Sequence, residues 1–398
     1  MFPRQKAYAS HTLAVGAEHE LSVREYGSPS GAPVVYLHGG PGGSTPPDLP
    51  RLFDPELWRV VCIDQRGCGD SRSADRLRDN TTNHLLADVE AVRCFLGIAS
   101  WGVMGSSYGS FLGALYAARH SECVRWVLLH GVFLGSAAEV EWLFEAGGAA
   151  RFYPEQWEQL HAGAQGVRNV SHYAALRLAN VTWKRPELLI QYYALLSDDS
   201  VPRAHPLPLP AGGAGGDDDT TAAATASASG SSTAAATASA SGSSTAAATA
   251  SALSTALAAA AVLTKWEDEM ETLVPTPATH EPCELLAGAQ LATHHFWHGC
   301  FVPLEGALPE LRTARATLGA IPCAIVQGRH DVLCPPHTAS ALHAAWPSST
   351  LRIVEAGAHA LFEKPMRTAV QACLLQLREQ SDADGRAGGE RVKRARSS

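Results

Sequence analysis

The sequence predicts an α/β fold, in which helices cover a mostly parallel sheet and a helical region is inserted near the middle of the chain. Two observations lead to this expectation. Short apolar and β-branched runs of strand length alternate with segments of helical periodicity toward both ends of the chain. Between them, from about residue 132 to residue 309, the strand pattern fades and helix-like segments replace it. A chain of 398 residues has room for one large domain that carries such an insertion.

In the N-terminal part, strands and helices alternate in the order that a parallel sheet requires. The unbroken apolar runs Ala32–Leu37 and Arg59–Ile63 predict strands that are buried on both faces. Apolar residues then recur at helical spacing from Leu85 to Leu96, which predicts an amphipathic helix packed on the sheet. The alternation continues with a strand, a helix and a strand at Gly102–Met104, Phe111–Arg119 and Val124–Leu129.

The inserted region, residues 132–309, is expected to lie over the sheet as a helical cap domain. It contains the repeat TAAATASASGSS, which occurs at Thr221–Ser232 and again at Thr233–Ser244. Small side chains cannot bury enough surface to offset the entropy of ordering, so we expect a disordered loop at about 204–254. Alanine would give this loop no more than transient helix. A stacked solenoid is the alternative, but each copy lacks an apolar face.

Strand patterns return at Cys323–Val326 and Thr350–Val354, and a helical pattern follows at about Met366–Leu377. The expected organisation is therefore a first core segment at 1–131, the cap at 132–309 and a second core segment at 310–380. The remaining residues, 381–398, are polar and end in RVKRARSS. We expect a disordered, solvated tail there, although a nuclear-localisation signal is an open alternative.

The composition argues against several classes of function. A formal net charge of -8 disfavours a nucleic-acid partner, which requires a clustered basic surface. Neither a signal peptide nor a bilayer-spanning run is visible, so we expect a cytoplasmic protein with no membrane partner. The nine cysteines are odd in number and form no C-x-x-C pair. We therefore expect reduced thiols, no metal and no cofactor.

The pentapeptide G-x-S-x-G at 105–109 places Ser107 between a predicted strand and a predicted helix. This is the context of a nucleophile elbow, where glycines allow a sharp turn that exposes the serine at the edge of the sheet. The pentapeptide alone is a weak signal, because a turn serine that bonds its own backbone gives the same pattern. The assignment of Ser107 as nucleophile therefore depends on partner residues elsewhere.

The chain supplies both partners that a nucleophilic serine needs, a base and an acid that orients the base. Asp331 follows the predicted strand at 323–326, and His359 follows the predicted strand at 350–354. The order Ser, Asp, His, with each residue after a strand, is typical of the α/β-hydrolase fold. His330 is a weaker candidate for the base, because its side chain would point away from that of its neighbour Asp331.

Acyl transfer also needs hydrogen-bond donors for the oxyanion that develops in the transition state. The run HGGPGG at 38–43 follows the first predicted strand, and its glycines let the backbone approach a substrate carbonyl. The N–H groups of Gly40 and of Tyr108, which follows the nucleophile, are the expected pair. A phosphate-binding loop is the alternative, but its usual motifs are absent from the sequence.

Several motifs, in this order, resemble those of the proline iminopeptidase family, whose forms are HGGPGG, DQRGxGxS, NTT and GGSWGS. Here they read HGGPGG, DQRGCGDS at 64–71, NTT at 80–82 and GSSYGS at 105–110. GRHDVLCP at 328–335 and the segment around His359 continue the resemblance over nearly the whole chain apart from the repeat and the tail. The resemblance implies an α/β-hydrolase fold with a cap and a serine peptidase that removes an N-terminal residue, preferably proline, from peptides.

The resemblance further implies a site in the cap for the substrate amine, which buried carboxylates can hold. One family glutamate is matched by Glu267, directly after Trp266, and an aromatic residue of the site is matched by Phe133. Two family positions are changed. The segment I-E-N-H-Y-F reads LATHHF at 291–296, with Ala292 in place of the second glutamate, and His130 stands in place of an arginine.

Three hypotheses of function remain open from the sequence. The first is an aminopeptidase that acts on peptides with a free N-terminus. The second is an esterase or amidase with a relaxed amine requirement, which the alanine at position 292 favours. The third is a binding protein without catalysis, which the complete set of triad residues disfavours. A metal site at His294, His295 and His298 is a further alternative, but no spaced Cys or carboxylate accompanies these histidines.

Overall fold

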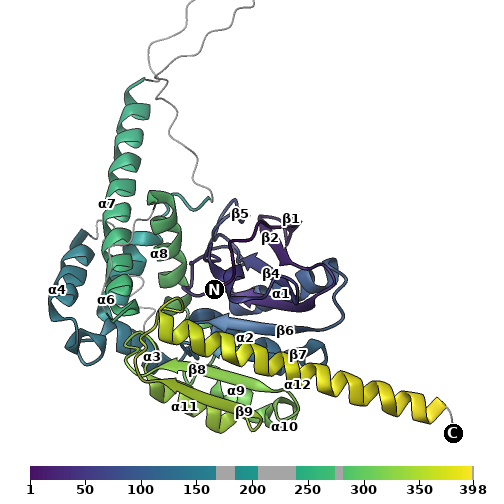
Figure 1. Ribbon diagram of the computed structural model, residues 1–398. Coiled ribbons are helices and arrows are strands. Elements are labelled where there is room, and N and C mark those ends of the chain that lie inside the picture. Colours follow the sequence, from purple (N-terminus) through teal and green to yellow (C-terminus); the bar gives the residue numbers. More distant parts are fainter. Residues whose placement is uncertain (167–183, 205–238, 274–280, 397–398) are drawn as a thin grey trace, which may run out of the picture.

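The computed structural model describes residues 1–166, 184–204, 239–273 and 281–396 (Figure 1). Within these ranges, nine strands form one sheet in the order β1-β2-β4-β3-β6-β7-β8-β9, and β5 pairs with β2. Neighbours from β4 to β9 run parallel, whereas β2 pairs antiparallel with β1, β4 and β5. The α/β class with a mostly parallel sheet is confirmed. The strands are β1 (Ala9–Ala14), β2 (His19–Gly27), β3 (Ala32–Leu37), β4 (Trp58–Asp64), β5 (Arg72–Ser73), β6 (Trp101–Ser106), β7 (Val124–His130), β8 (Cys323–Gly328) and β9 (Ser349–Val354).

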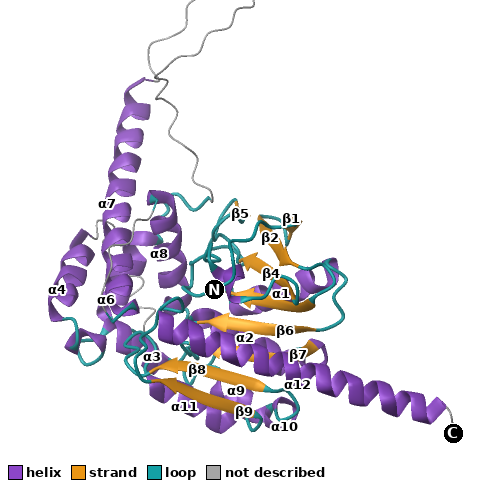
Figure 2. Ribbon diagram, in the orientation of Figure 1, coloured by secondary structure: helices purple, strands orange, loops and turns teal. Residues whose placement is uncertain are grey.

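Different helices cover the two faces of the sheet (Figure 2). One face packs against α12 (Lys364–Arg396), and the other packs against α1 (Thr82–Phe95), α2 (Tyr108–Arg119) and α11 (Pro336–Ala345). Consecutive residues of the central strands belong to opposite cores, because successive strand side chains point to opposite faces. This two-sided burial explains the unbroken apolar runs in the sequence.

The helices of the inserted region gather beside the carboxyl ends of the central strands (Figure 1). α7 packs against α4, α6 and α8, so these helices form one unit. None of the helices in the described ranges is both long and apolar enough to cross a membrane. The helices of this unit are α3 (Ala137–Phe144), α4 (Pro154–Gly163), α6 (Glu187–Leu196), α7 (Ser239–Glu271) and α8 (Pro282–Trp297), and the short helices after it are α9 (Leu308–Thr313) and α10 (Arg315–Leu318).

Part of the segment expected to be a disordered loop, about 204–254, is helical. Residues 239–254 form the first half of α7, whose second half is anchored by the buried residues Leu263, Trp266 and Met270. Alanine has the highest helix propensity, so an anchored helix extends through an alanine-rich segment at little cost. The rest of that expected loop, residues 205–238, lies outside the described residues.

The polar tail at 381–398, expected to be disordered, continues α12 as far as Arg396. Leu374 and Leu377 are buried against the sheet and anchor the helix. Adding residues to an existing helix costs far less than starting one, and the Arg, Lys, Glu and Ala residues of the tail are good helix formers. Residues 397–398 lie outside the described residues.

The antiparallel strands β1 and β2 at the N-terminal edge were not predicted from the sequence. β1 alternates half-buried with exposed residues along its length. Such a strand carries polar residues at every second position and lacks the continuous apolar run by which the central strands were recognised.

Candidate active site

Ser107 lies at a sharp turn between β6 and α2. Its backbone has φ 54° and ψ -125°, a left-handed conformation that costs a residue with a side chain about 1–3 kcal/mol. The flanking glycines are required by close backbone approaches. A Cβ at Gly105 would lie 2.2 Å from the Gly109 carbonyl oxygen, and a Cβ at Gly109 would lie 2.0 Å from the Leu37 carbonyl oxygen. The pentapeptide G-x-S-x-G at 105–109 therefore forms the strained turn expected from the sequence.

Hydrogen bonds with β7, with the loop that follows it and with α2 hold the elbow in place. The Ser107 N–H donates to the His130 carbonyl at the end of β7 (2.9 Å). The Ser107 carbonyl accepts from the N–H (2.8 Å) and the hydroxyl (2.6 Å) of Ser110. Ser110 Oγ in turn accepts from the N–H of Phe133 (3.0 Å). The strained backbone is thus fixed on both sides of the serine.

His359 and Asp331 form a buried pair on the loops that follow β9 and β8. His359 Nδ1 lies 2.8 Å from Asp331 Oδ2, and the two side chains are 7% and 0% exposed. Burial alone would lower the pKa of His359, but the negative charge and hydrogen bond of Asp331 outweigh it and raise the pKa above its ordinary value. His359 also lines a cavity together with Ser107. The competing candidate His330 is exposed and lines neither of the cavities at Ser107.

Gln327, which the sequence did not single out, positions the carboxylate of Asp331. Its amide nitrogen donates to Asp331 Oδ2 (2.8 Å) and to the Cys334 carbonyl (2.8 Å). Its amide oxygen accepts from the N–H of Val132 (2.9 Å). The Cys334 N–H donates to Asp331 Oδ1 (2.8 Å). The only sequence signal for this role was the place of Gln327 near the end of the strand that precedes the acid.

The glycine-rich loop at 38–43 lies directly against the elbow. A Cβ at Gly39 would approach the Ser107 Cβ to 2.9 Å, and Gly40, at φ 116°, lines both cavities that contain Ser107. Tyr108 is the first residue of α2, so its backbone N–H belongs to the group of helix N-terminal donors that lack an intrahelical acceptor. The loop is fastened by Gln65, whose backbone and side-chain nitrogens donate to the Nε2 and carbonyl of His38.

The cavity above Ser107 measures about 490 Å³ and has an acidic wall formed by the cap. Glu267, Asp268 and Glu271 from α7 and Glu284 from α8 line it, together with the glycine-rich loop and His359. Burial, with repulsion from Asp268 and Glu271, raises the pKa of Glu267 to about 8. The structure thus places a carboxyl group that resists ionisation beside Ser107.

A second, smaller cavity of about 60 Å³ adjoins Ser107 and has an apolar and a polar side. Phe133, Leu143, Phe296 and Leu333 contribute its apolar wall, and Glu267 and Glu271 its polar side. The structure therefore brings together Ser107, His359, Gly40, Glu267 and Phe133 around connected space, with Asp331 behind the histidine. The side chain of Tyr108 is the exception, because it points into the buried interior.

The two positions at which the sequence departs from the family forms, 130 and 292, line the large cavity. Ala292 lines it and adds no charge. His130 is buried, and both of its ring nitrogens lack a hydrogen-bond partner. Burial, with the nearby positive charge of His359, lowers the pKa of His130 to about 3, so this imidazole is neutral near pH 7. In the part of the chain that the structure describes, no three His, Cys, Asp or Glu side chains are grouped so as to hold a metal ion.

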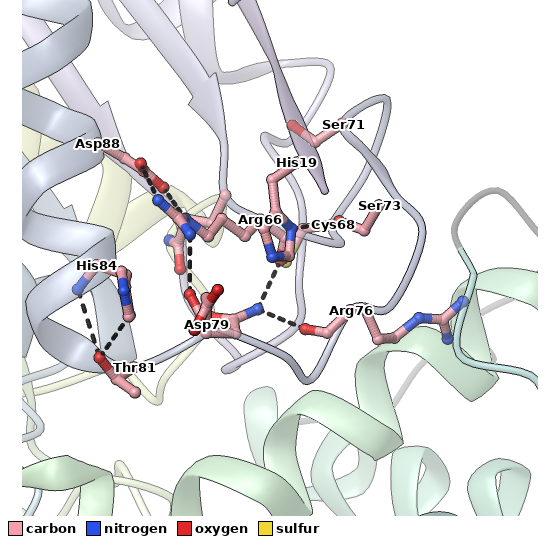
Figure 3. Close-up of polar contacts among 12 residues, drawn as sticks. His19, Arg66, Cys68, Ser71, Ser73, Arg76, Asp79, Thr81, His84 and Asp88 are labelled. Carbon is pink, nitrogen blue, oxygen red and sulfur yellow. Dashed lines mark hydrogen bonds and ion pairs between the residues drawn. The ribbon is translucent and has the colours of Figure 1, made fainter. Parts of the chain in front are cut away.

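The motifs without an assigned chemical role, DQRG and NTT, form a buried polar network under the cap (Figure 3). Arg66 makes a two-pronged ion pair with Asp88, with distances of 2.6 and 2.7 Å, and both side chains are 6% exposed. Arg66 also donates to the Asp79 carbonyl (2.8 Å). The side-chain amide of Asn80 donates to the carbonyls of Arg66 (3.1 Å) and Arg76 (2.8 Å). These bonds fix the loop from β4 to α1 beside the active site.

Comparisons with known proteins agree with the fold and with the motifs. The family model of the alpha/beta hydrolase fold matches residues 32–365. A proline iminopeptidase of Neisseria meningitidis is 33% identical over 373 residues, which cover 93% of this chain and 96% of the relative. One of Arabidopsis thaliana is 32% identical over 364 residues, which cover 89% and 76%. A probable hydrolytic enzyme of Pseudomonas aeruginosa PAO1 superposes with a TM-score of 0.51 at 14% identity, over 94% of this chain and 95% of that one, and shows the fold alone.

Proposed function

Because this chain belongs to the proline iminopeptidase family of the α/β-hydrolase fold, we propose that it is a serine aminopeptidase that releases an N-terminal residue, preferably proline, from peptides. The observation that carries the proposal is the buried His359–Asp331 pair in a cavity that also contains Ser107 and an acidic wall. Peptides with a free N-terminus are the proposed substrates. A cytoplasmic location and the absence of nucleic-acid, membrane, metal and cofactor partners stay predictions.

In the proposed reaction, His359 Nε2 accepts the proton of the Ser107 hydroxyl as Oγ attacks the carbonyl carbon of the first peptide bond. Asp331 holds the Nδ1–H and stabilises the imidazolium that forms. The N–H groups of Gly40 and Tyr108 donate to the oxyanion of the tetrahedral intermediate. His359 then donates its proton to the leaving amine, and an acyl-enzyme on Ser107 remains, which water hydrolyses by the same steps.

The acidic wall supports recognition of the substrate amine. Glu267, at the position that the sequence marks for this role, lines both cavities with Ser107. Glu271 lies one helical turn further along α7 and lines both cavities as well. We propose that Glu271 supplies the second carboxylate, in place of the family glutamate that is Ala292 here. A bound ammonium would favour the ionised form of Glu267, so substrate binding would release its proton.

The apolar part of the smaller cavity supports the preference for proline. Phe133 and Phe296 pack edge to face there, with their ring centroids 6.0 Å apart. A pyrrolidine ring is compact and apolar and would be desolvated in such a space, which favours it over longer polar side chains. We therefore propose that Phe133 and Phe296 contact the ring of the substrate proline.

Labelling with a fluorophosphonate probe, combined with turnover of prolyl arylamide, tests the proposal. We expect the wild-type protein to be labelled at Ser107 and to hydrolyse the arylamide. The Ser107→Ala variant should keep its fold, lose the label and lose about 10⁴-fold or more in kcat. Unlabelled wild-type protein without turnover would contradict the proposal and favour a protein that only binds its ligand.

A further inference from the structure

The side chain of the residue after the proposed nucleophile, Tyr108, is tied to helix α8 of the cap by a buried hydrogen bond. Tyr108 is fully buried, and its hydroxyl lies 3.0 Å from Nδ1 of His295 on α8. The two rings pack at 5.3 Å between centroids, and Phe111 and Phe133 pack on the tyrosine ring at 5.4 and 6.2 Å. α8 therefore contacts the elbow directly through this residue pair.

The other ring nitrogen of His295 connects the pair to the NTT motif. Nε2 lies 3.3 Å from Oδ1 of Asn80. The amide nitrogen of Asn80 is committed to two carbonyls, those of Arg66 and Arg76, so its oxygen is the atom that faces the histidine. Asn80 is thus an acceptor at this contact, and Nε2 of His295 must carry the hydrogen.

These contacts fix the donor and the acceptor of the two hydrogen bonds that link Asn80, His295 and Tyr108. Burial, with the neighbouring His294 and His298, lowers the pKa of His295 well below its ordinary value, so the ring is neutral and has one N–H. Since Nε2 donates to Asn80, Nδ1 accepts from the Tyr108 hydroxyl. Thr82 Oγ1 donates to the Cys300 carbonyl at 2.6 Å and lies 3.5 Å from the Tyr108 hydroxyl, so His295 Nδ1, at 3.0 Å, is the nearer acceptor for that hydroxyl.

The position of Tyr108 matters because the peptide group between Ser107 and Tyr108 carries the proposed oxyanion donor. That peptide group follows the strained backbone of Ser107, whose φ is 54°. A side chain fixed at its far end restricts the rotation of the peptide group at its near end. We propose that His295 is a positioning residue for the oxyanion hole: through the Tyr108 hydroxyl it orients the Tyr108 N–H, which makes helix α8 of the cap part of the catalytic apparatus.

The two residues of this contact lie in segments that resemble family motifs. The family forms GGSWGS and I-E-N-H-Y-F have Trp and Tyr at the positions of Tyr108 and His295. Both partners of the hydrogen bond therefore depart from the family forms, and an acceptor nitrogen faces a donor hydroxyl as a result. The inference rests on the proposed acyl-transfer function but does not depend on the identity of the N-terminal residue.

A pair of substitutions at position 295 separates the two hydrogen bonds of the ring. Asparagine places its amide at the level of Nδ1, so His295→Asn keeps an acceptor for Tyr108. Glutamine reaches the level of Nε2, so His295→Gln keeps the contact with Asn80 and loses the one with Tyr108. We expect kcat of His295→Asn to stay within about threefold of wild type. His295→Gln should lose about 10- to 100-fold in kcat with KM within about twofold, since a misplaced oxyanion donor costs on this scale.

Two further variants test whether the loss of activity comes from the hydrogen bond or from a general loss of stability. Tyr108→Phe removes only the hydroxyl and should reproduce the loss of His295→Gln, with no further loss in the double variant. His298→Gln, on an exposed neighbour at the end of α8, is the matched control and should behave as wild type. All rates are measured on p-nitrophenyl acetate as well as on prolyl arylamide. If the wild type hydrolyses p-nitrophenyl acetate but not prolyl arylamide, proline specificity is refuted and this inference is unaffected.

Binding of a peptide aldehyde gives the readout that a merely structural role would not change. The aldehyde forms a tetrahedral adduct with an oxyanion, so its affinity should fall in His295→Gln and Tyr108→Phe by the same factor as kcat/KM. The affinity for free proline, which lacks the adduct, should stay unchanged. Equal kcat values in His295→Asn and His295→Gln, or aldehyde affinity that does not follow kcat/KM, would overturn the inference.

Discussion

At the scale of single residues, the carboxylate of Asp331, the proposed acid of the triad, depends on a glutamine that has no chemical role of its own. Asp331 accepts hydrogen bonds from His359, from the Gln327 amide and from the Cys334 N–H. The Gln327 oxygen is bonded to the backbone of Val132, so the amide cannot rotate freely. Gln327 thus connects the acid to the strand end that leads into the cap.

Replacing Gln327 by alanine should reduce kcat about 10-fold and leave KM nearly unchanged. The carboxylate of Asp331 would lose one donor, and His359 would be held less firmly, which affects the transition state more than substrate binding. Steady-state kinetics on prolyl arylamide measures both constants. Gln371→Ala is the control. Gln371 lies on α12, away from the site, and the substitution removes its side-chain hydrogen bond to the Leu52 carbonyl. An unchanged kcat in Gln327→Ala would contradict this role.

Replacing Glu267 by glutamine should change stability with pH in a defined direction. The pKa of Glu267 is raised from 4.5 to about 8 in the folded protein, so folding favours its protonated form. The contribution of Glu267 to the free energy of unfolding is fully present below about pH 4.5 and is lost as the pH rises through about 8. The Tm of Glu267→Gln relative to wild type should therefore be higher at pH 9 than at pH 5. A difference in Tm that is the same at both values would contradict the shifted pKa.

At the scale of elements, the loop between β4 and α1 is held by a buried ion pair instead of by apolar contacts. Arg66 pairs with Asp88 of α1, and the same loop supplies Asn80 to the contact with α8. The sequence marked this loop only as a motif match. Its structural role depends on a contact across 22 residues of sequence, which no local pattern reveals.

Asp88→Ala should lower the free energy of unfolding by about 3–5 kcal/mol, because it leaves the buried Arg66 guanidinium without its counter-charge. Denaturant titration measures the change. Glu355→Ala, which removes the exposed partner of Arg329, is the matched control and should leave stability unchanged. Equal effects of the two substitutions would show that burial of the Arg66–Asp88 pair is unimportant.

At the scale of the whole molecule, the sequence predicted the sheet core and the residues that follow its strands. The motifs at 38–43, 105–109, 331 and 359 could be placed because each follows a strand that the sequence pattern predicted. The edge hairpin β1–β2 and the helical ends of α7 and α12 were missed or expected to be disordered. Their order depends on pairing or anchoring elsewhere in the chain, and single-segment patterns do not contain that information.

The acidic wall illustrates why part of the site could not be predicted. Glu267 was identified through its family position, whereas Glu271 becomes a candidate only once both are seen to line the same cavities. Their spacing of four residues on one helix was the available signal, but it has meaning only if that face of α7 points toward Ser107. The positioning roles of Gln327 and His295 could not be predicted either, because they arise from residues distant in sequence; the sequence pointed to His295 only as a candidate metal ligand.

Deleting residues 212–238 should leave kcat/KM on prolyl arylamide within about threefold of wild type. Every residue that the proposed mechanism uses lies in the described ranges, and shortening a long connection changes its closure entropy little. The anchored half of α7, which carries Glu267 and Glu271, stays in the deletion variant. A loss of more than about 10-fold would mean that the deleted segment contributes to the site.

The central claim, that the acidic wall over Ser107 selects a free N-terminal amine, is tested most directly by one pair of substrates. Prolyl arylamide and N-acetylprolyl arylamide share the scissile bond and differ in the charge of the terminal nitrogen. We predict that kcat/KM for the free amine exceeds that for the blocked one by about 100-fold or more, since a buried carboxylate loses its charged partner in the latter. Equal kcat/KM values for the two substrates would contradict the account and identify the enzyme as an esterase or amidase of the same fold.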